Sequence, residues 1–338
     1  MAVDLTTRYL GLTLPHPIVC GASPLSADLA MVLRLEDAGA AAIVMHSLFE
    51  EQILKDAMRR PHLGRESHTR TAVDRSPTLN AYTLSPGQYL EHLLRVKSRV
   101  RIPIVASLNG TTPEGWLQYA RAVERAGADA LELNFYHVAI DPAETGQTIE
   151  QRLIDTVAVV KQSVSIPVTV KLSPFYSSVP NIAARLEHIG ADGLVLFNRF
   201  YQADIDPVTH GATVSVQLSD SSDLLLRLHA IAILAGRVQL SLAVSGGVHD
   251  PADVVKAVLA GADVVQITST LLRHGPPRLT YLRTQLEEWG QRQACDSLAA
   301  VKGVASLACQ SGLSRFERDE YVSVLQSWNP DHLRLPDS

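Results

Sequence analysis

Four copies of one short pattern decide the fold of this chain: Ala38-Gly39-Ala40-Ala41-Ala42-Ile43-Val44-Met45, Ala126-Gly127-Ala128-Asp129-Ala130-Leu131-Glu132-Leu133, Ile189-Gly190-Ala191-Asp192-Gly193-Leu194-Val195-Leu196 and Ala260-Gly261-Ala262-Asp263-Val264-Val265-Gln266-Ile267. In each copy a glycine stands where the end of a helix needs a left-handed residue, and the next alanine lets that helix pack close to the following strand. The strand is almost entirely apolar, as strands of a parallel sheet covered on both faces are. The pattern predicts alternating helices and parallel strands.

A polar residue follows each of these glycines seven or eight positions later. The four residues are His46, Asn134, Asn198 and Thr268. They fall at the C-terminal ends of the predicted strands, which is where barrel enzymes carry their catalytic and binding groups. The alternative is that the pattern only marks the boundaries between helices and strands. Four copies that share both the glycine and the polar residue at the strand end favour a functional site.

Size and composition fit one barrel domain. The chain has 338 residues, 46% of them apolar, which is enough to bury a large core and is a usual length for a (β/α)8 domain with insertions. We expect one domain over residues 1–338, with residues 309–338 as a C-terminal tail. The net charge is −5 and the basic residues are scattered, which argues against nucleic-acid binding.

Cysteine usage and hydropathy indicate the compartment. Cys20, Cys295 and Cys309 are too few and too far apart for a zinc site or a disulfide framework. Residues 1–8 hold no apolar run of a secretory signal, and no segment reaches the length of a membrane-spanning helix. These features predict a cytoplasmic protein without a metal site and without membrane association.

Strict alternation of strands and helices predicts a closed barrel. Polar excursions at 47–86 and 199–219 follow the second and sixth strands, as lids over the barrel mouth would. An open doubly wound sheet is the alternative, but it calls for a glycine-rich fingerprint after the first strand, and Gly21-Ala22-Ser23-Pro24 is not one. The predicted strands are 17–21, 42–45, 104–108, 130–134, 168–172, 193–197, 239–244 and 264–267, and the predicted helices are 28–38, 88–100, 113–126, 149–163, 180–189, 223–234, 251–259, 278–291 and 298–308.

The ends of the last two strands predict a phosphate site. Strand seven ends in Ser245-Gly246-Gly247-Val248, and strand eight ends in Gln266-Ile267-Thr268-Ser269-Thr270. Paired glycines let backbone N–H groups approach an anion, and hydroxyls with a helix N-terminus complete such a cradle. The loops after strands seven and eight are also the recurrent phosphate site of this barrel. A tight turn beside capping threonines is the alternative.

Burial of the charged Lys171 side chain on an apolar strand is energetically unfavourable unless the ammonium group meets an anion. Lys171 could form a Schiff base, or it could place positive charge against an electron-rich cofactor ring. A structural salt bridge is the third possibility. Asn80, Asn134 and Asn198 add planar groups with a donor and an acceptor each, which suit amide-rich rings such as flavins and pyrimidines.

At these positions the chain resembles the dihydroorotate dehydrogenases, in particular the cytosolic class 1 type, and the resemblance covers nearly the whole chain. It implies a barrel that binds FMN, with the FMN phosphate on Gly246, Gly247, Thr268 and Ser269 and with Lys171 at the N1/O2 edge of the flavin. The matching stretches are Leu12, Pro15, Pro17 and Ile18 leading to Ala22-Ser23, then Ile104-Val105-Ala106-Ser107-Leu108-Asn109-Gly110, Glu132-Leu133-Asn134, Val170-Lys171-Leu172-Ser173-Pro174, and the ends of strands seven and eight. The resemblance also implies that Ser107, Asn109, Asn134 and Asn198 line the ring and the substrate, and that Ala22 and Ser23 lie beneath the ring.

On the substrate side the chain departs from that family. The loop after strand four, which carries a cysteine or serine base in the family, reads Phe135-Tyr136-His137-Val138-Ala139 here. His137 is therefore the candidate base, since a neutral imidazole accepts a proton, with Tyr136 and His46 as its competitors. His46 stands where the family has a lysine, and Ala139 replaces an asparagine. Tyr82-Thr83-Leu84-Ser85-Pro86 replaces the Gly-Leu-Pro-Asn of the family's first excursion, and the candidate substrate-binding residues are His46, Asn80, Asn134 and Asn198.

The resemblance implies an FMN-dependent oxidoreductase of pyrimidine biosynthesis. Hydride would pass from dihydroorotate, or from a related cyclic CH–CH substrate, to flavin N5. A soluble electron acceptor or a redox partner protein would then reoxidise the flavin, and the chain would form a homodimer. The alternatives are a flavin enzyme with another substrate, a cofactor-free barrel lyase that uses Lys171 as a Schiff base, and a flavin-binding subunit without turnover.

Overall fold

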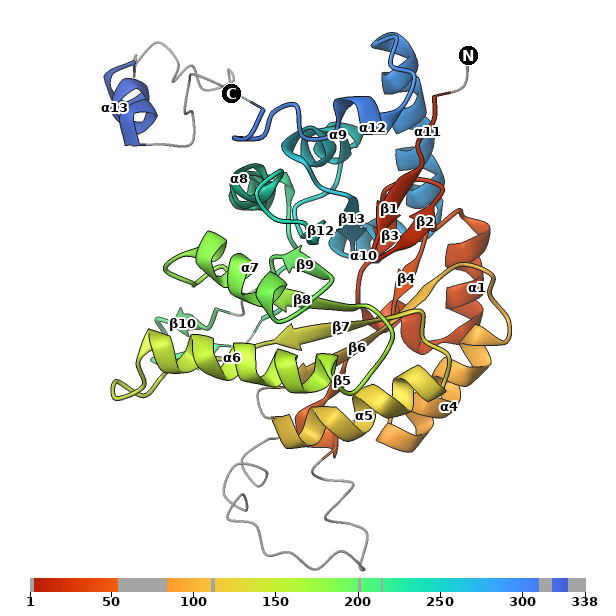
Figure 1. Cartoon of the computed structure of the whole chain (residues 1–338), viewed down its shortest axis with the longest axis vertical. Coiled ribbons are helices and arrows are strands. Elements are labelled where there is room, and N and C mark those ends of the chain that lie inside the picture. Colours follow the sequence, from red (N-terminus) through yellow and green to blue (C-terminus); the bar gives the residue numbers. More distant parts are fainter. Residues whose placement is uncertain are drawn as a thin grey trace, which may run out of the picture.

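Eight parallel strands close into a barrel (Figure 1). The computed structural model describes residues 3–53, 84–110, 113–199, 202–213, 215–309 and 318–327. Pairing of β4 with β6 closes the ring, which confirms the predicted (β/α)8 barrel and rules out the open sheet. A short strand, β5 (Leu48–Phe49), extends β6 beyond the ring. Around the barrel the order is β3 (Ile18–Cys20), β4 (Ile43–Val44), β6 (Ile104–Gly110), β7 (Ala130–Phe135), β8 (Val168–Leu172), β9 (Gly193–Leu196), β12 (Ser241–Ser245) and β13 (Val264–Ile267).

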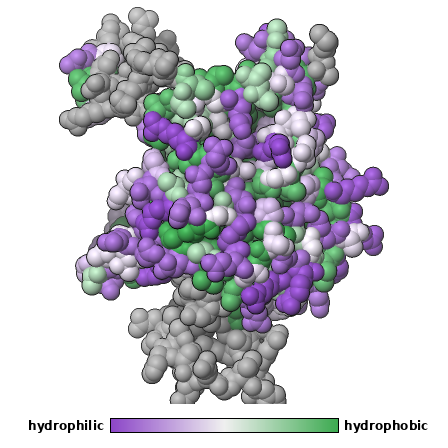
Figure 2. Space-filling view, viewed as in Figure 1, coloured by the Kyte–Doolittle hydropathy of each residue, from purple (hydrophilic) through white to green (hydrophobic). Residues whose placement is uncertain are grey.

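Helices surround the barrel and connect its strands (Figure 1). Figure 2 shows one face of the molecule, on which hydrophilic side chains predominate and hydrophobic ones lie in small patches. Among the described residues no helix is both long and apolar enough to cross a membrane. The main helices are α1 (Leu29–Asp37), α4 (Pro86–Lys97), α5 (Pro113–Arg125), α6 (Gly146–Lys161), α7 (Val179–His188), α8 (Leu224–Leu234), α9 (Pro251–Ala260) and α11 (Pro277–Arg292), with the short α10 (Ser269–His274) after the last strand.

The four repeated glycines end helices in the left-handed conformation, as the sequence pattern predicted. Gly39, Gly127, Gly190 and Gly261 all have positive φ, from +86° to +118°, and each follows a helix. In three copies the aspartate adds a contact that the pattern did not reveal. Each carboxylate accepts a 2.7 Å hydrogen bond from the backbone N–H of a residue on the neighbouring strand, and each also meets a lysine. The pairs are Asp129 with Ile104, Asp192 with Val168 and Asp263 with Leu242, so these carboxylates fix how adjacent strands align.

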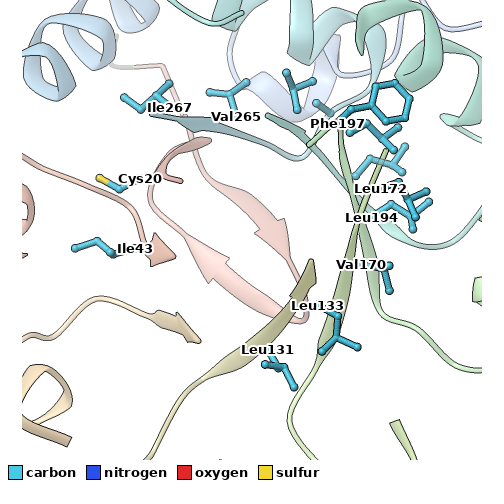
Figure 3. Close-up of a cluster of buried hydrophobic side chains, with 14 of the residues drawn as sticks. Cys20, Ile43, Leu131, Leu133, Val170, Leu172, Leu194, Phe197, Val265 and Ile267 are labelled. Atoms are coloured by element: carbon cyan, nitrogen blue, oxygen red, sulfur yellow. The ribbon is translucent and has the colours of Figure 1, made fainter. Parts of the chain in front are cut away.

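Strand residues alternate between two buried layers. One set points outward and packs against the helices, as the side chains of Leu131, Val170 and Leu194 do (Figure 3). The other set points into the barrel, where small apolar residues such as Val105 and Ala243 form a separate cluster. Because alternation has a period of two, the same inward register brings polar side chains toward the carboxyl end of the barrel.

An N-terminal hairpin covers the other end of the barrel, which the sequence did not lead us to expect. β1 (Thr7–Tyr9) pairs with β2 (Leu12–Leu14), and Tyr9, Leu10 and Leu14 join the interior cluster. The Leu10 N–H donates to Ser241 Oγ at 3.0 Å. Burial, and next the charge of Glu132, raise the pKa of the Tyr9 hydroxyl, so that hydroxyl stays neutral. The hairpin therefore reaches the polar centre of the barrel from below.

The structure tests the sequence-based expectations for the last helix, the two excursions and the C-terminal tail. The predicted helix at 298–308 is wrong, because α12 (Leu298–Val301) ends early and Gly303 follows with φ +75°, which an α-helix cannot contain. The 199–219 excursion holds an antiparallel hairpin of β10 (Asp204–Asp206) and β11 (Gly211–Thr213). Most of the 47–86 excursion lies outside the described residues. The predicted tail contains α13 (Arg318–Gln326), and its separation from the domain stays a prediction.

Gly261 offers a direct test of the pattern. A Cβ at this residue would lie 2.3 Å from Ala235 Cβ, and φ is +118°. Gly261→Ala should therefore lower the free energy of unfolding by about 2–4 kcal/mol, measured by urea denaturation followed by circular dichroism. Gly87→Ala is the matched control, because nothing lies within 4 Å of its added Cβ, and it should leave stability unchanged or slightly raised. Equal stabilities for the two variants would contradict the assigned role of Gly261.

Candidate active site

A cavity of about 710 Å³ opens at the carboxyl ends of the barrel strands. Seven of the residues predicted from the sequence line it, although they come from six different strands and loops. Tyr136, the competitor base named from the sequence, lines it too, and so do Phe49, Gln52, Tyr89 and Arg199, which were not predicted as members of a ligand site. The seven predicted residues are Ala22, Ser23, His46, Asn109, Asn134, Lys171 and Asn198.

Strand register brings the central polar residues together. Asn109 on β6 pairs with Asn134 on β7, which in turn pairs with Lys171 on β8. Asn198 follows β9, and its Nδ2 donates to Asn134 Oδ1 at 2.7 Å. This bond uses the carbonyl oxygen of Asn134 and one N–H of Asn198, and it leaves the amide N–H groups of Asn134 and the carbonyl oxygen of Asn198 for other partners. These four residues form one contiguous polar floor.

Lys171 has an anionic neighbour inside the barrel. Its Nζ lies 3.7 Å from Glu132 Oε1, and both side chains are buried. The second Glu132 oxygen accepts a 2.7 Å hydrogen bond from Gln266 Nε2. The structural salt bridge considered from the sequence is therefore present, while Lys171 also lines the cavity. Glu132 and Gln266 were not predicted as part of the site, although a glutamate within an apolar strand is a visible signal.

His46 is held by groups behind the cavity wall. Its backbone N–H donates to Ser26 Oγ at 2.6 Å, and its ring meets Tyr89 edge-on at 5.2 Å between centroids. The ring of His92 lies 6.2 Å away. Burial, and next the neighbouring His92, lower the pKa of His46 to about 4. The ring is neutral near pH 7.

Ser107 lies just below the cavity rather than in its wall. The side chain is fully buried, and its Oγ is 2.8 Å from Ser47 Oγ. The Ser107 N–H donates to the Tyr89 hydroxyl at 3.2 Å. Since Ser47 and Tyr89 do line the cavity, Ser107 supports its wall from beneath. Asn80, the remaining predicted ligand residue, lies outside the described residues.

His137 faces a neighbouring pocket. That pocket has a volume of about 380 Å³ and shares Val138 with the main cavity. His137 Nε2 lies 2.7 Å from a carboxylate oxygen of Glu144, whose other oxygen accepts from Arg152. These two partners, His137 first, lower the pKa of Glu144. The structure thus does not bring His137 together with the other predicted residues, and its role as the base stays a prediction, whereas Tyr136 lines the cavity itself.

The predicted phosphate residues form a second group beside the cavity. Gly246 and Gly247 follow β12 with φ of +89° and +80°, and Thr268 and Ser269 begin α10 after β13. A Cβ on Gly21, the neighbour of Ala22, would lie 2.5 Å from Thr268 Oγ1, so this group adjoins the cavity wall. Ser219 links its two halves, because Gly247 N–H donates to Ser219 Oγ and Ser219 N–H donates to Ser269 Oγ.

One positive and one negative side chain, Arg227 and Asp253, lie close to this glycine turn. The buried guanidinium of Arg227 lies behind it, with Nη2 3.0 Å from where a Cβ on Gly246 would be. Arg227 Nε donates to Ser245 O at 2.6 Å. The start of α9 instead carries the buried carboxylate of Asp253, which accepts from His249 N–H. An anion would therefore be held by the turn and α10 rather than by α9. Arg227 was missed, although a lone arginine in the apolar run 224–234 was the signal.

Comparison with known proteins gives a consistent result. A family model described as dihydroorotate dehydrogenase matches residues 5–289. The chain is 28% identical over 311 residues to the catalytic subunit of dihydroorotate dehydrogenase B (NAD(+)) of Methanothermobacter thermautotrophicus, covering 89% of this chain and 98% of the relative. It is 23% identical over 318 residues to the NAD-dependent dihydropyrimidine dehydrogenase subunit PreA of Escherichia coli, covering 90% and 77%. The barrel, the site at its carboxyl end and the matched family model agree, and the chain belongs to the dihydroorotate dehydrogenase family.

Proposed function

We propose that this protein is an FMN-dependent oxidoreductase that acts on the CH–CH bond of dihydroorotate or of a related cyclic substrate in pyrimidine biosynthesis. The observation that carries the proposal is the convergence of Lys171 and the Asn134–Asn198 pair on a cavity of about 710 Å³. The names of the relatives support it, since they are dehydrogenases of dihydroorotate and of dihydropyrimidine.

The residues present fit a flavin at both ends. At the ring end, Lys171 and the amide groups of Asn109 and Asn134 would meet the polar edge of the ring, with Ala22 and Ser23 in the same wall. At the phosphate end, Gly246 and Gly247 expose backbone in a conformation that side chains rarely adopt. The Arg227 guanidinium behind that turn adds positive charge. A bound flavin would supply the hydride acceptor.

The side chains of this protein would then orient the substrate and take up its proton. Asn134 and Asn198 present a donor and an acceptor to a ring. For His137 to act as the base, its ring would exchange the Glu144 contact for the substrate across Val138. Tyr136 and His46 are the competitors that already line the cavity.

The Lys171 Schiff-base lyase is the less favoured function. A Schiff base requires the neutral amine as nucleophile. The ion-pair geometry of Lys171 with Glu132 at 3.7 Å favours an electrostatic role instead. We also propose a homodimer in the cytoplasm that passes electrons to a soluble acceptor or a redox partner protein. Support for a partner comes from the relatives, whose names describe a catalytic subunit and a subunit.

Cofactor content is the first test. The purified protein should be yellow and should contain about one FMN per chain, measured by absorbance after denaturation. A colourless protein that takes up no FMN, but is trapped on Lys171 by borohydride with a carbonyl compound, would support the lyase instead.

Lys171 is the second test, and Glu132 provides its control. Lys171→Gln should weaken FMN binding by about tenfold or more, because a charge-assisted contact is lost. The single variant also leaves Glu132 buried without its cation, so stability should fall. The double variant Lys171→Gln with Glu132→Gln removes both charges and should regain stability while keeping the weaker FMN binding. Recovery of full FMN affinity in the double variant would reduce Lys171 to a structural partner of Glu132.

The base is the third test. If His137 is the base, flavin reduction depends on its imidazole, which takes up the substrate proton. His137→Ala should lower the rate of flavin reduction by roughly 10²–10⁴-fold in stopped-flow measurements while FMN stays bound. Tyr136→Phe is the parallel variant, since it removes a hydroxyl from the main cavity. Parent-like reduction by His137→Ala together with a slow Tyr136→Phe would transfer the role to Tyr136.

A further inference from the structure

His249 is a buried histidine beside the glycine turn, and the proposed function assigns it no role. Only 8% of its surface is exposed. It comes two residues after Gly247, and its backbone N–H donates to Asp253 Oδ2 at 3.0 Å. That bond fixes the residue at the start of α9, next to the residues proposed to hold the FMN phosphate.

Ser219 connects the His249 imidazole to the glycine turn. Its Oγ lies 3.3 Å from His249 Nε2 and accepts a hydrogen bond of 3.3 Å from the Gly247 N–H. The Ser219 N–H donates to Ser269 Oγ at 3.1 Å, and Ser219 is buried as well. A change of charge at His249 therefore reaches both halves of the candidate phosphate group through one serine.

The direction of the contact between Ser219 and His249 depends on the charge of the ring. A neutral imidazole with its lone pair on Nε2 accepts the hydroxyl proton of Ser219, whereas a protonated imidazole donates from both nitrogens. The hydroxyl oxygen has two acceptor sites, so it can accept from the Gly247 N–H and from protonated His249 together. The hydroxyl proton is then free to meet an anion. Protonation of His249 thus adds a donor and a positive charge at the turn.

Charged side chains of both signs surround the imidazole among the described residues. They are Arg273, Arg278, Asp220, Asp250 and Asp253. Burial first, and then the charge of Arg273, lower the pKa of His249 against the opposing effect of the three carboxylates. With these groups the ring is neutral near pH 7. A phosphate beside it would favour the protonated ring, since a nearby opposite charge raises a histidine pKa by about 1–3 units.

We propose that His249 takes up a proton when the FMN phosphate binds at the glycine turn, and that this uptake makes the affinity for the cofactor depend on pH. The proton comes from solvent and ends on the imidazole, while the Ser219 hydroxyl turns its own proton from Nε2 to a phosphate oxygen. The inference rests on the proposed function and deepens it by naming a residue that controls retention of the cofactor. Binding that takes up a proton weakens as the pH rises.

Release of FMN from the loaded protein tests the proposal. The protein is diluted stepwise at several pH values, and the fluorescence of the released flavin gives the dissociation constant at each. The FMN dissociation constant of the parent should rise at least about threefold from about pH 7 to about pH 8.5. The phosphate of FMN itself contributes little to this change, because its second pKa is about 6.

Two histidine variants and one second ligand supply the controls. His249→Gln stays neutral at every pH and should show an FMN affinity that hardly changes over this range. His274→Gln, at the exposed end of α10, should keep the pH dependence of the parent. Riboflavin lacks the phosphate, so its affinity for the parent should not depend on pH in this range.

The outcomes separate this inference from the proposed function. Equal pH dependence in the parent and in a folded, FMN-binding His249→Gln variant would overturn the inference. The riboflavin comparison needs no variant, and the same pH dependence for riboflavin as for FMN would overturn it too. A protein that takes up no FMN refutes the proposed function itself, whereas one that holds FMN with an affinity independent of pH refutes this inference alone.

Discussion

Closure of the barrel by the pairing of β4 with β6 is the constraint on which the rest of the structure depends. Ile43 pairs with Ile104, and the Met45 N–H donates to Val105 O at 2.8 Å. Because all eight strands are parallel, closure gathers every carboxyl end on one rim. The period-two alternation then assigns each residue to the helix-facing layer or to the interior, so His46 and Asn134 can share one cavity although they are distant in sequence.

The barrel interior is polar where a stable core alone would be apolar. Glu132 is fully buried, with Lys171 on one side and Gln266 on the other. A buried ion pair adds little to stability, since the cost of removing both charges from water offsets their attraction. The pair lies directly beneath the cavity, where Lys171 reaches the lining, while the N-terminal hairpin packs at the opposite end.

The candidate cofactor-side residues and the candidate substrate-side residues are positioned by different parts of the fold. The positions of the glycine turn, Lys171 and the asparagines are set by strand ends and strand register. The candidate substrate-side residues stand on loops or at the rim, where His46 lines the cavity and His137 turns toward Glu144. Such a division lets one barrel keep its cofactor chemistry while substrate preference changes.

The sequence by itself determined the αβ alternation, the barrel and which polar residues stand at strand ends, because glycine caps, apolar strands and polar strand ends are local signals. It predicted that Asn134, Lys171 and Asn198 stand at strand ends, which meet on one rim of a parallel barrel, whereas Asn109 was implied only by the family resemblance. Only the tertiary structure paired Lys171 with Glu132, because that contact depends on strand register. It also decided that Tyr136 faces the main cavity while His137 faces Glu144, because packing rather than local sequence orients adjacent loop residues.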